Sequence, residues 1–303
     1  MNSFNFRKIF KSKLINLHDN NSRSLIMQGN SLSIMRNIKD NSVDLIFADE
    51  PYNIGKNFDG IKDKWPSTKS YIDWNKRWIR QAMRILTTNG TIYIMTATQY
   101  MPYIDIYLSQ NWNVINRIVW CYDSSGVQSK HHFGSLYEPI IMATKSNKSK
   151  YTFNYKDIKI EAKTGAKRKL IDYRKNPPRP YNKKKVPGNV WNYNRVRYRM
   201  PEYENHPTQK PEAMLKRIVL ASSNKEDLVL DPFSGSFTTS KVAQDLGRNS
   251  IGIDLNLQYY KIGLRRLGIS KTFHGKKLVK HRKHKAHYKY KHSKIKPKQM
   301  TIF

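Results

Sequence analysis

The sequence predicts an α/β fold built on a doubly wound, mostly parallel sheet. Short apolar, β-branched runs alternate with longer stretches of helical spacing, which is typical of strands joined by crossover helices. Three of these runs end in an acid, at Asp49, Asp231 and Asp254. At 303 residues the chain is long enough for one large α/β domain that carries an insert.

The elements can be assigned in chain order. A strand is expected at 25–28, and Ser31 is placed to cap the helix that follows it. The remaining pattern predicts strands at 43–48, 91–95, 117–120, 137–142, 227–230 and 250–253, and helices at 74–86, 101–109, 211–222 and 236–246. Pro211 suits the first turn of its helix, because the N–H that proline lacks has no helical partner there.

The most informative motif follows the run at 43–48. It reads Asp49-Glu50-Pro51-Tyr52 and stands where the strand ends. Open parallel sheets bind ligands at the carboxyl ends of their strands. A carboxylate beside an aromatic ring suits a flat base with an exocyclic amine, since the carboxylate accepts the amine's hydrogens and the ring stacks on the base. For these four residues alone, a strand-end acid and an ordinary proline turn explain the pattern equally well.

A second motif has the order of a cofactor site. The run at 227–230 leads into Asp231-Pro232-Phe233-Ser234-Gly235, and a helix-like stretch follows. A glycine turn between a strand and a helix lets backbone N–H groups approach a cofactor. The next strand ends at Asp254, a position where an acid commonly binds ribose hydroxyls. The full Gly-x-Gly-x-x-Gly pattern is missing, so the evidence lies in the order of the parts.

Together with His206-Pro207-Thr208-Gln209-Lys210-Pro211, these motifs resemble the amino-methyltransferases of DNA, which methylate adenine N6 or cytosine N4 with S-adenosylmethionine. The catalytic motif precedes the cofactor motif, so the chain is similar to the circularly permuted beta class. The resemblance runs over about 20–267. It implies a circularly permuted, Rossmann-like methyltransferase sheet with an irregular target-recognition insert. The implied divisions are a catalytic half at 1–144, a target-recognition region at 145–205, a cofactor-binding half at 206–268 and a basic tail at 269–303.

The resemblance also implies a catalytic group, made of Asp49, Glu50, Pro51 and Tyr52. The target base would flip out of duplex DNA into the pocket. Asp49 and the backbone carbonyl of Glu50 would accept hydrogen bonds from its amine, and Tyr52 would stack on its ring. The most favoured reaction is methyl transfer to adenine N6.

The residues implied to bind S-adenosylmethionine are Asn30, Lys210, Asp231, Phe233, Gly235 and Asp254. Residues 231–235 would contact its methionine end, Lys210 would pair with its carboxylate, and Asp254 would bind its ribose. Asn30 stands where the family usually has an acid, and its amide oxygen can still accept one hydrogen bond from the cofactor's adenine.

Two residues depart from the family's pattern. Glu50 replaces the first proline of Asp-Pro-Pro-Tyr, so the fixed φ of proline is lost. Its carboxylate would raise the pKa of Asp49 or attract the sulfonium, unless it points to solvent and does neither. Restoring proline at this position is expected to increase methyl transfer. Phe237, where many members have glycine, lies at a helix start and is expected to be harmless.

The composition agrees with a nucleic-acid partner. The chain has 56 Lys and Arg against 22 Asp and Glu, a formal charge of +34, which favours a polyanion, with nucleic acid as the default partner. The resemblance implies that this partner is double-stranded DNA. One cysteine excludes a disulfide framework and a cysteine-rich zinc site, and no metal is expected. No apolar stretch is long enough for a membrane span, and the first residues lack the apolar core of a secretory signal. These features predict a soluble protein of the bacterial cytoplasm.

The irregular stretch at 145–205 has the composition of a DNA-binding surface, because basic and aromatic residues interleave there. The candidate DNA contacts are Lys167, Arg168, Arg174, Arg179, Arg195 and Arg197. Phosphate contact is the favoured role for each basic residue, and packing for any single aromatic residue. The tail at 269–303 has no acid and five of the nine histidines, which predicts a disordered nucleic-acid-binding arm. A histidine metal site is less favoured, because no ligand spacing recurs.

Several alternatives can be weighed. Cytosine-C5 methylation needs a cysteine nucleophile, typically after proline, but Cys121 follows Trp120. Cytosine-N4 methylation stays open, although Asp49 favours adenine because N4 enzymes more often have serine there. A DNA-binding remnant that Glu50 has inactivated also stays open, and RNA is a weaker substrate candidate.

Overall fold

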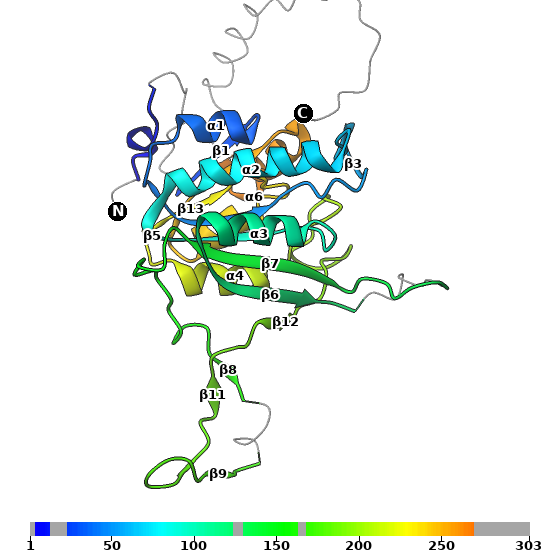
Figure 1. The fold of residues 1–303 in the computed structure, drawn as a ribbon. Coiled ribbons are helices and arrows are strands. Elements are labelled where there is room, and N and C mark those ends of the chain that lie inside the picture. The colour runs from blue at the N-terminus through cyan, green and yellow to red at the C-terminus, as the bar shows by residue number, and fades with distance from the viewer. Residues whose placement is uncertain (1–3, 13–22, 124–129, 163–167, 270–303) are drawn as a thin grey trace, which may run out of the picture.

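The computed structural model of the protein describes residues 4–12, 23–123, 130–162 and 168–269. Lys167 lies outside the described residues, and so does the basic tail at 269–303 apart from Ile269. The rest of the chain contains one large sheet with helices on both faces (Figure 1).

Eight strands form this sheet in the order β1-β14-β13-β2-β5-β7-β6-β12. Strands β1, β14, β13, β2 and β5 run parallel, β7 is antiparallel to β5 and β6, and β12 is parallel to β6. The strand bounds are β1 Ser24–Gln28, β2 Val43–Asp49, β5 Leu86–Met95, β6 Asn113–Cys121, β7 Tyr137–Thr144, β12 Val190–Asn192, β13 Leu228–Asp231 and β14 Asn249–Asp254. The mostly parallel α/β sheet predicted from the sequence is thereby confirmed.

Helices cover both faces of the sheet. One core lies between the sheet and three helices, α1 (Ser31–Asn37), α2 (Thr68–Ile85) and α3 (Met101–Asn111), and a second core packs against α4 (Glu212–Ser222) and α5 (Thr238–Asp245). Strand β2 serves both cores because successive side chains point to opposite faces. Ile46 and Ala48 enter the first core, and Leu45 and Phe47 enter the second. The last helix, α6 (Leu257–Arg266), contacts β1 and β14.

Four helix starts differ from their predicted places, among them α4, which begins at Glu212 and not at 211, and α5, which begins at Thr238 and not at 236. The helix after β1 is capped by the side chain of Asn30, which accepts a hydrogen bond from the N–H of Ser33, so the cap is not Ser31. Helix α2 begins at Thr68, earlier than the apolar spacing indicated, because Ser67 and Ser70 form a reciprocal capping box.

The topology brings the two halves of the chain together at one edge. Strand β13 pairs with β2, and β14 pairs with β1, with Gln28 opposite Asp254. Because these strands are parallel, the acids that end them, Asp49, Asp231 and Asp254, all stand at the carboxyl edge. The cofactor motif and the catalytic motif are thus neighbours in space, although Asp231 comes 182 positions after Asp49 in the chain.

The middle of the region at 145–205, around β8 to β11, projects away from the sheet as an extended arm (Figure 1). Two short strand pairs stiffen it, β8 (Ile160–Glu161) with β11 (Lys184–Lys185) and β9 (Ile171–Asp172) with β10 (Arg179–Pro180). The sequence predicted that 145–205 is irregular, but toward its end β12 joins the main sheet and the Trp191 side chain is buried. The other small elements are a 3-10 helix at Phe6–Ile9 and the hairpin of β3 (Asn57–Phe58) and β4 (Ile61–Lys62). None of the described helices has the length and apolarity to cross a membrane.

Candidate active site

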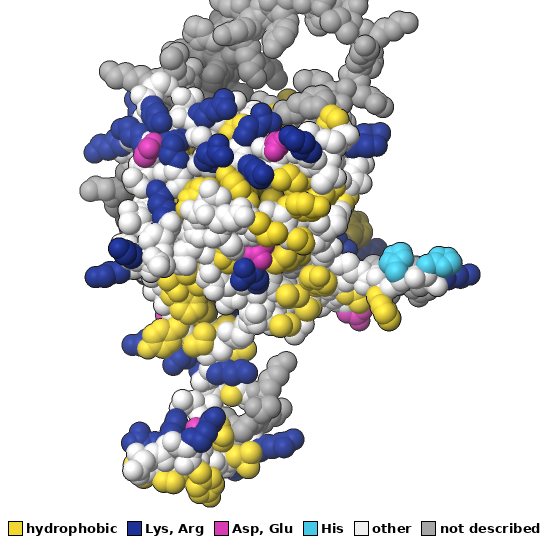
Figure 2. Space-filling model, viewed as in Figure 1, with side chains coloured by type: hydrophobic (Ala, Val, Ile, Leu, Met, Phe, Trp, Pro, Cys, Tyr) yellow, Lys and Arg dark blue, Asp and Glu magenta, His cyan; other side chains and the backbone are white. Residues whose placement is uncertain are grey.

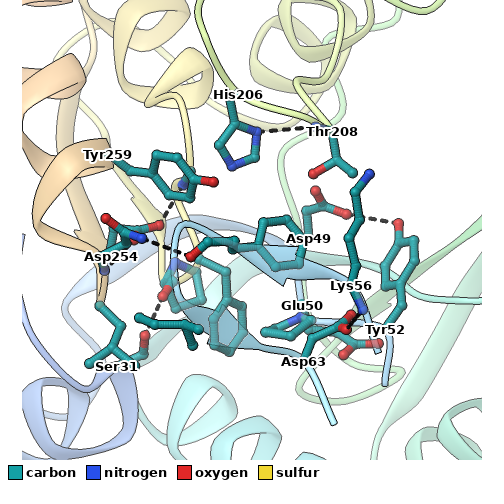
Figure 3. Close-up of a pocket in the computed structure, with 18 of the residues that line it drawn as sticks. Ser31, Asp49, Glu50, Tyr52, Lys56, Asp63, His206, Thr208, Asp254 and Tyr259 are labelled. Carbon is teal, nitrogen blue, oxygen red and sulfur yellow. Dashed lines mark hydrogen bonds between the residues drawn. The ribbon is translucent and has the colours of Figure 1, made fainter. Parts of the chain in front are cut away.

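A pocket opens at the carboxyl edge of the sheet (Figure 3). Its lining comes from the end of β2 and the β3–β4 hairpin, from the loops that follow β1, β13 and β14, and from the segment that precedes α4. All four residues of the predicted catalytic motif line it, and so do Asn30, Lys210, Phe233, Gly235 and Asp254. Asp231, the remaining predicted cofactor residue, is not part of the lining.

Four side chains form a buried polar network beside the pocket. The hydroxyl of Tyr52 lies 2.8 Å from Asp49 Oδ1 and 2.7 Å from Glu138 Oε2, so its single hydrogen is shared between two carboxylates. Lys210 Nζ lies 2.7 Å from Asp49 Oδ2 and 3.5 Å from Glu138 Oε2. The network fixes the positions of the Asp49 carboxyl and the Tyr52 ring at the same time.

The charges of this network follow from burial and mutual contact. Burial raises the pKa of Asp49, and the neighbouring Glu138 raises it further, although Lys210 opposes both. Burial also opposes ionisation of Glu138, but Lys210, the Tyr52 hydroxyl and Arg195 outweigh it and lower the Glu138 pKa. For Lys210 the two carboxylates outweigh burial and raise the pKa. The site therefore holds a charged lysine between two acids.

Glu138 and its contacts were missed in the sequence. It stands at the start of β7, 86 positions after Tyr52, with no motif around it that indicates a functional role. The sequence did indicate Lys210 as a site residue, but with the cofactor's carboxylate as its expected partner. Its predicted pairing with the cofactor's carboxylate stays a prediction, because in this structure its Nζ binds the two acids of the network.

Glu50 does not point to solvent, contrary to one of the expectations for it. Only 2% of its surface is exposed, and its carboxyl is bound by the hydroxyls of Tyr71 and Thr96. Its own pKa is raised well above the usual value, first by burial and then by Asp49 and Asp63, against the opposing effect of the two hydroxyls. The main cause of the raised Asp49 pKa is burial, with Glu138 as the contributing acid, so Glu50 is not the group responsible.

The loop after β13 is held by its two flanking acids. Asp231 accepts from the N–H of Phe233 at 3.0 Å and from the hydroxyl of Thr239 at 2.6 Å, and burial raises its pKa to about 7. Both carboxyl oxygens of Asp231 accept hydrogen bonds, and the residue does not line the pocket, so its role in this structure is to hold the loop in its conformation. Its predicted direct contact with a cofactor is untested, and the structure shows a supporting position.

Asp254 reaches the pocket from the end of β14. Its Oδ2 accepts from the N–H of Gly235 at 2.8 Å and its Oδ1 from the N–H of Asn256 at 2.7 Å. Burial raises its pKa to about 6, against the effect of these two N–H donors. A partly desolvated carboxylate that lines a pocket suits a ligand with hydroxyl donors.

Gly235 has no room for a side chain. Its φ is +50°, and a Cβ there would lie 2.7 Å from Nε2 of His206. The His206 ring packs edge-on against Tyr259, with the ring centres 4.4 Å apart. Burial, Lys210 and Lys56 lower the His206 pKa to about 3, so the ring is neutral in the cell. The close approach brings the main chain of this turn to the pocket wall, with the Gly235 N–H donated to Asp254.

Aromatic rings line the opposite wall. Phe233 packs against Trp74 and Trp78, with ring centres 5.6 and 5.2 Å apart, and all three residues line the pocket. The two tryptophans come from α2, whose buried face carries them because they are four positions apart. Such an aromatic wall suits a flat, partly apolar ligand.

Phe237 has a larger structural role than its place at a helix start indicated. It is the N-cap of α5 with a φ of +57°, a left-handed conformation that favours glycine. Its ring is fully buried and packs onto Gly252 and Gly263, where an added Cβ would come within 2.7 and 2.6 Å of the ring. Phenylalanine can therefore stand at position 237, where many family members have glycine, because Gly252 and Gly263 leave room for its ring.

The candidate DNA contacts divide into two groups. Arg168, Arg174 and Arg179 are exposed on the projecting arm, where Arg174 pairs with Asp172 at 2.8 Å. Arg195 lies nearer the pocket, 4.7 Å from the ring centre of Tyr122, and contributes to the lowered pKa of Glu138. Arg197 is exposed and donates to the backbone oxygen of Asp123. Figure 2 shows Lys and Arg spread over the described surface and along the arm.

Comparison with known proteins agrees with this geometry. Residues 43–265 match the N6/N4 methyltransferase family, described as DNA methylase. DNA adenine methyltransferase YhdJ of Escherichia coli K12 is 54% identical over 275 residues, which cover 91% of this chain and 93% of that protein. Type II methyltransferase M.HpaI of Haemophilus parainfluenzae is 37% identical over 240 residues, which cover 78% of this chain and 72% of that protein.

Solved structures show the same fold. The M1.HpyAVI–SAM complex aligns with a TM-score of 0.54 and 25% identity, covering 80% of this chain and 99% of that one. The cytosine-N4-specific PvuII DNA methyltransferase aligns with a TM-score of 0.63 at 14% identity over 83% of this chain and 90% of that one, which supports the fold alone. Because the family match spans both the catalytic and the cofactor motif, the chain belongs to the N6/N4 family of DNA methylases.

Proposed function

We propose that this protein transfers a methyl group from S-adenosylmethionine to the N6 amine of adenine in duplex DNA. The observation that carries the proposal is the arrangement of Asp49 and Tyr52, which one network holds in the pocket that Asp254 and Gly235 also line. The adenine specificity of the relative YhdJ supports the choice of base. The cellular setting we propose is the bacterial cytoplasm.

The cofactor half of the pocket suits S-adenosylmethionine. Asp254 offers carboxylate oxygens for ribose hydroxyls, and Gly235, which has no side chain, lets the methionine end approach the main chain of its turn closely. The Asn30 side chain already caps α1, but its oxygen can accept a second hydrogen bond from an adenine amine. When bound, the cofactor supplies an activated methyl group on a sulfonium.

The catalytic half of the pocket suits a flipped base. A flipped base is read by stacking and by hydrogen bonds to its edge. The ring of Tyr52 offers the stacking face, and Asp49 keeps a free lone pair on each oxygen beside the bonds to Tyr52 and Lys210. Accepting a hydrogen bond from the amine orients the nitrogen's lone pair toward the methyl group. Catalysis then rests on position and electrostatics.

The basic arm supports duplex DNA as the substrate form. Its exposed arginines can neutralise phosphates, and the tail beyond 269 adds further positive charge. We propose that Arg168, Arg179 and Arg197 contact phosphates, with Arg174 joining them once DNA competes for its pairing with Asp172. Arg195 is placed closer to the flipped base, because it lies near Glu138.

The test is single-turnover transfer of labelled methyl groups to duplex DNA, followed by digestion and identification of the modified nucleoside. We expect N6-methyladenine from the wild type and none from Asp49→Ala, with cofactor affinity little changed. N4-methylcytosine as the product would instead establish the alternative base. If the wild type binds cofactor and DNA but transfers nothing to any duplex, the DNA-binding remnant replaces the enzyme.

A further inference from the structure

Glu50 is a buried carboxyl whose partners are hydroxyl groups. Its oxygens lie 2.6 and 2.5 Å from the Tyr71 hydroxyl, and Oε1 lies 2.6 Å from the Thr96 hydroxyl. None of the ion pairs recorded for the described residues involves it, whereas the adjacent Asp49 has a lysine partner. The two neighbouring acids of the motif are therefore held by different chemistry.

The partners of Glu50 are themselves rigid. Tyr71 on α2 and Thr96 just past β5 are both fully buried. The Tyr71 ring packs against Trp65 and Tyr100, with ring centres 5.0 and 4.5 Å away. The Glu50 side chain thus ties the turn to a helix on one side and to the neighbouring strand on the other.

The surroundings of Glu50 favour a neutral carboxyl. An ionised carboxylate buried without a cation is strongly destabilised, whereas a protonated one has a donor and acceptors that match two hydroxyls. The titratable groups facing it are Tyr71 from α2, Asp49 from β2 and Asp63 from the hairpin side. The two acids add negative charge, and the pKa of Tyr71 is raised by burial and by Glu50, so that its hydroxyl keeps its proton.

We propose that Glu50 is a positioning residue for methyl transfer, whose carboxyl, clamped by Tyr71 and Thr96, fixes the main chain between Asp49 and Tyr52. The inference rests on the proposed function and assigns Glu50 a part in it. A side-chain clamp does here what the rigid ring of a proline does in the motif that the chain resembles. The contacts also reverse the expectation that Glu50→Pro increases transfer, since that change leaves two buried hydroxyls without their partner.

Two substitutions separate a positioning role from a general structural one. Glu50→Gln keeps the size and neutral hydrogen bonding of a protonated carboxyl, and Glu50→Ala removes the clamp. We expect Gln to retain at least about half of the single-turnover rate and Ala to lose roughly tenfold or more, corresponding to at least about 1.4 kcal/mol of barrier. Cofactor affinity, measured by calorimetry, should be unchanged in both, because the Glu50 carboxyl is bound by Tyr71 and Thr96, which lie outside the loop that carries Asp254.

A control on the same strand isolates loss of stability. Asp44 lies at the other end of β2 and accepts from the N–H of Leu228 at 2.9 Å, away from the pocket. Asp44→Asn should lower the unfolding temperature without lowering the transfer rate of the folded protein. Tyr71→Phe should reproduce part of the loss seen with Glu50→Ala, and the two changes together should be less than additive because they break one contact.

The outcomes are distinct. An active wild type together with an equally active, folded Glu50→Ala overturns the positioning role and leaves the proposed function standing. A Glu50→Gln rate as low as that of Glu50→Ala overturns the neutral clamp. A wild type that methylates no DNA removes the proposed function itself, and the role of Glu50 in it falls at the same time.

Discussion

The affinity for S-adenosylmethionine is expected to fall in acid through Asp254. The Asp254 carboxyl lines the pocket, and burial raises its pKa to about 6 in the free protein. Ribose hydroxyls donate to the ionised form, so binding favours the carboxylate and is weakened as it gains a proton. Between about pH 7.5 and about pH 5 the ionised fraction falls roughly tenfold, which corresponds to about 1.4 kcal/mol of binding free energy.

The matched variant is Asp254→Asn. It keeps one acceptor but loses the charge, so affinity near neutral pH should fall about 10- to 100-fold, as for one charge-assisted hydrogen bond of about 1.5–3 kcal/mol. Its affinity should also lose the pH dependence that this group causes. Asp231 titrates in both proteins, with a pKa of about 7 in the wild type to which the charge of Asp254 contributes, and His206, at about 3, stays neutral throughout.

The assay is calorimetric titration of cofactor into both proteins over this pH range. Parallel pH profiles for wild type and Asp254→Asn would show that Asp254 does not contact the ribose. Stability has the opposite sign: the folded pKa of this acid lies above its ordinary 3.8, so ionisation of Asp254 lowers the free energy of unfolding as pH rises from about 4 to about 6. As the pH rises, the cofactor-free protein therefore loses the stability contributed by protonated Asp254, while its affinity for the cofactor increases.

Four further results are expected. Gly235→Ala places a methyl group against the His206 ring at a positive φ, so calorimetry should show cofactor affinity reduced by about tenfold or more while circular dichroism stays unchanged. Phe237→Ala empties a fully buried ring site, and urea denaturation should show a loss of about 3–5 kcal/mol; a loss under about 1 would contradict the packing. Glu138→Gln removes one of the two acids that anchor Tyr52, so the single-turnover rate should drop about tenfold or more at unchanged cofactor affinity, and an unaffected rate would exclude the network from catalysis. Removal of 269–303 should flatten the salt dependence of DNA binding without altering sequence preference, and an identical slope would show that the tail does not touch DNA.

The sequence by itself determined the sheet, most of its helices and the two motifs of the site. Strand runs such as 43–48 and 250–253 are apolar because both faces of a parallel sheet are buried, and that pattern is local. The acids that end them fall at one edge because parallel strands share a direction. The order of elements therefore predicted Asp49 and Asp254 at one edge of the sheet, and the family resemblance assigned them, with Tyr52 and Gly235, to the pocket that all four line.

Only the tertiary structure decided what those residues contact. Glu138 reaches Tyr52 from a strand that enters the sheet antiparallel, and Glu50 finds Tyr71 and Thr96 on two other elements. Such partners are set by the three-dimensional packing of segments far apart in the chain, and no local periodicity encodes them. From the sequence, Glu50 was expected to place a second charge beside Asp49. In the folded protein its carboxyl is buried and bound by two hydroxyls, and this environment, which only the tertiary structure supplies, determines its protonation state.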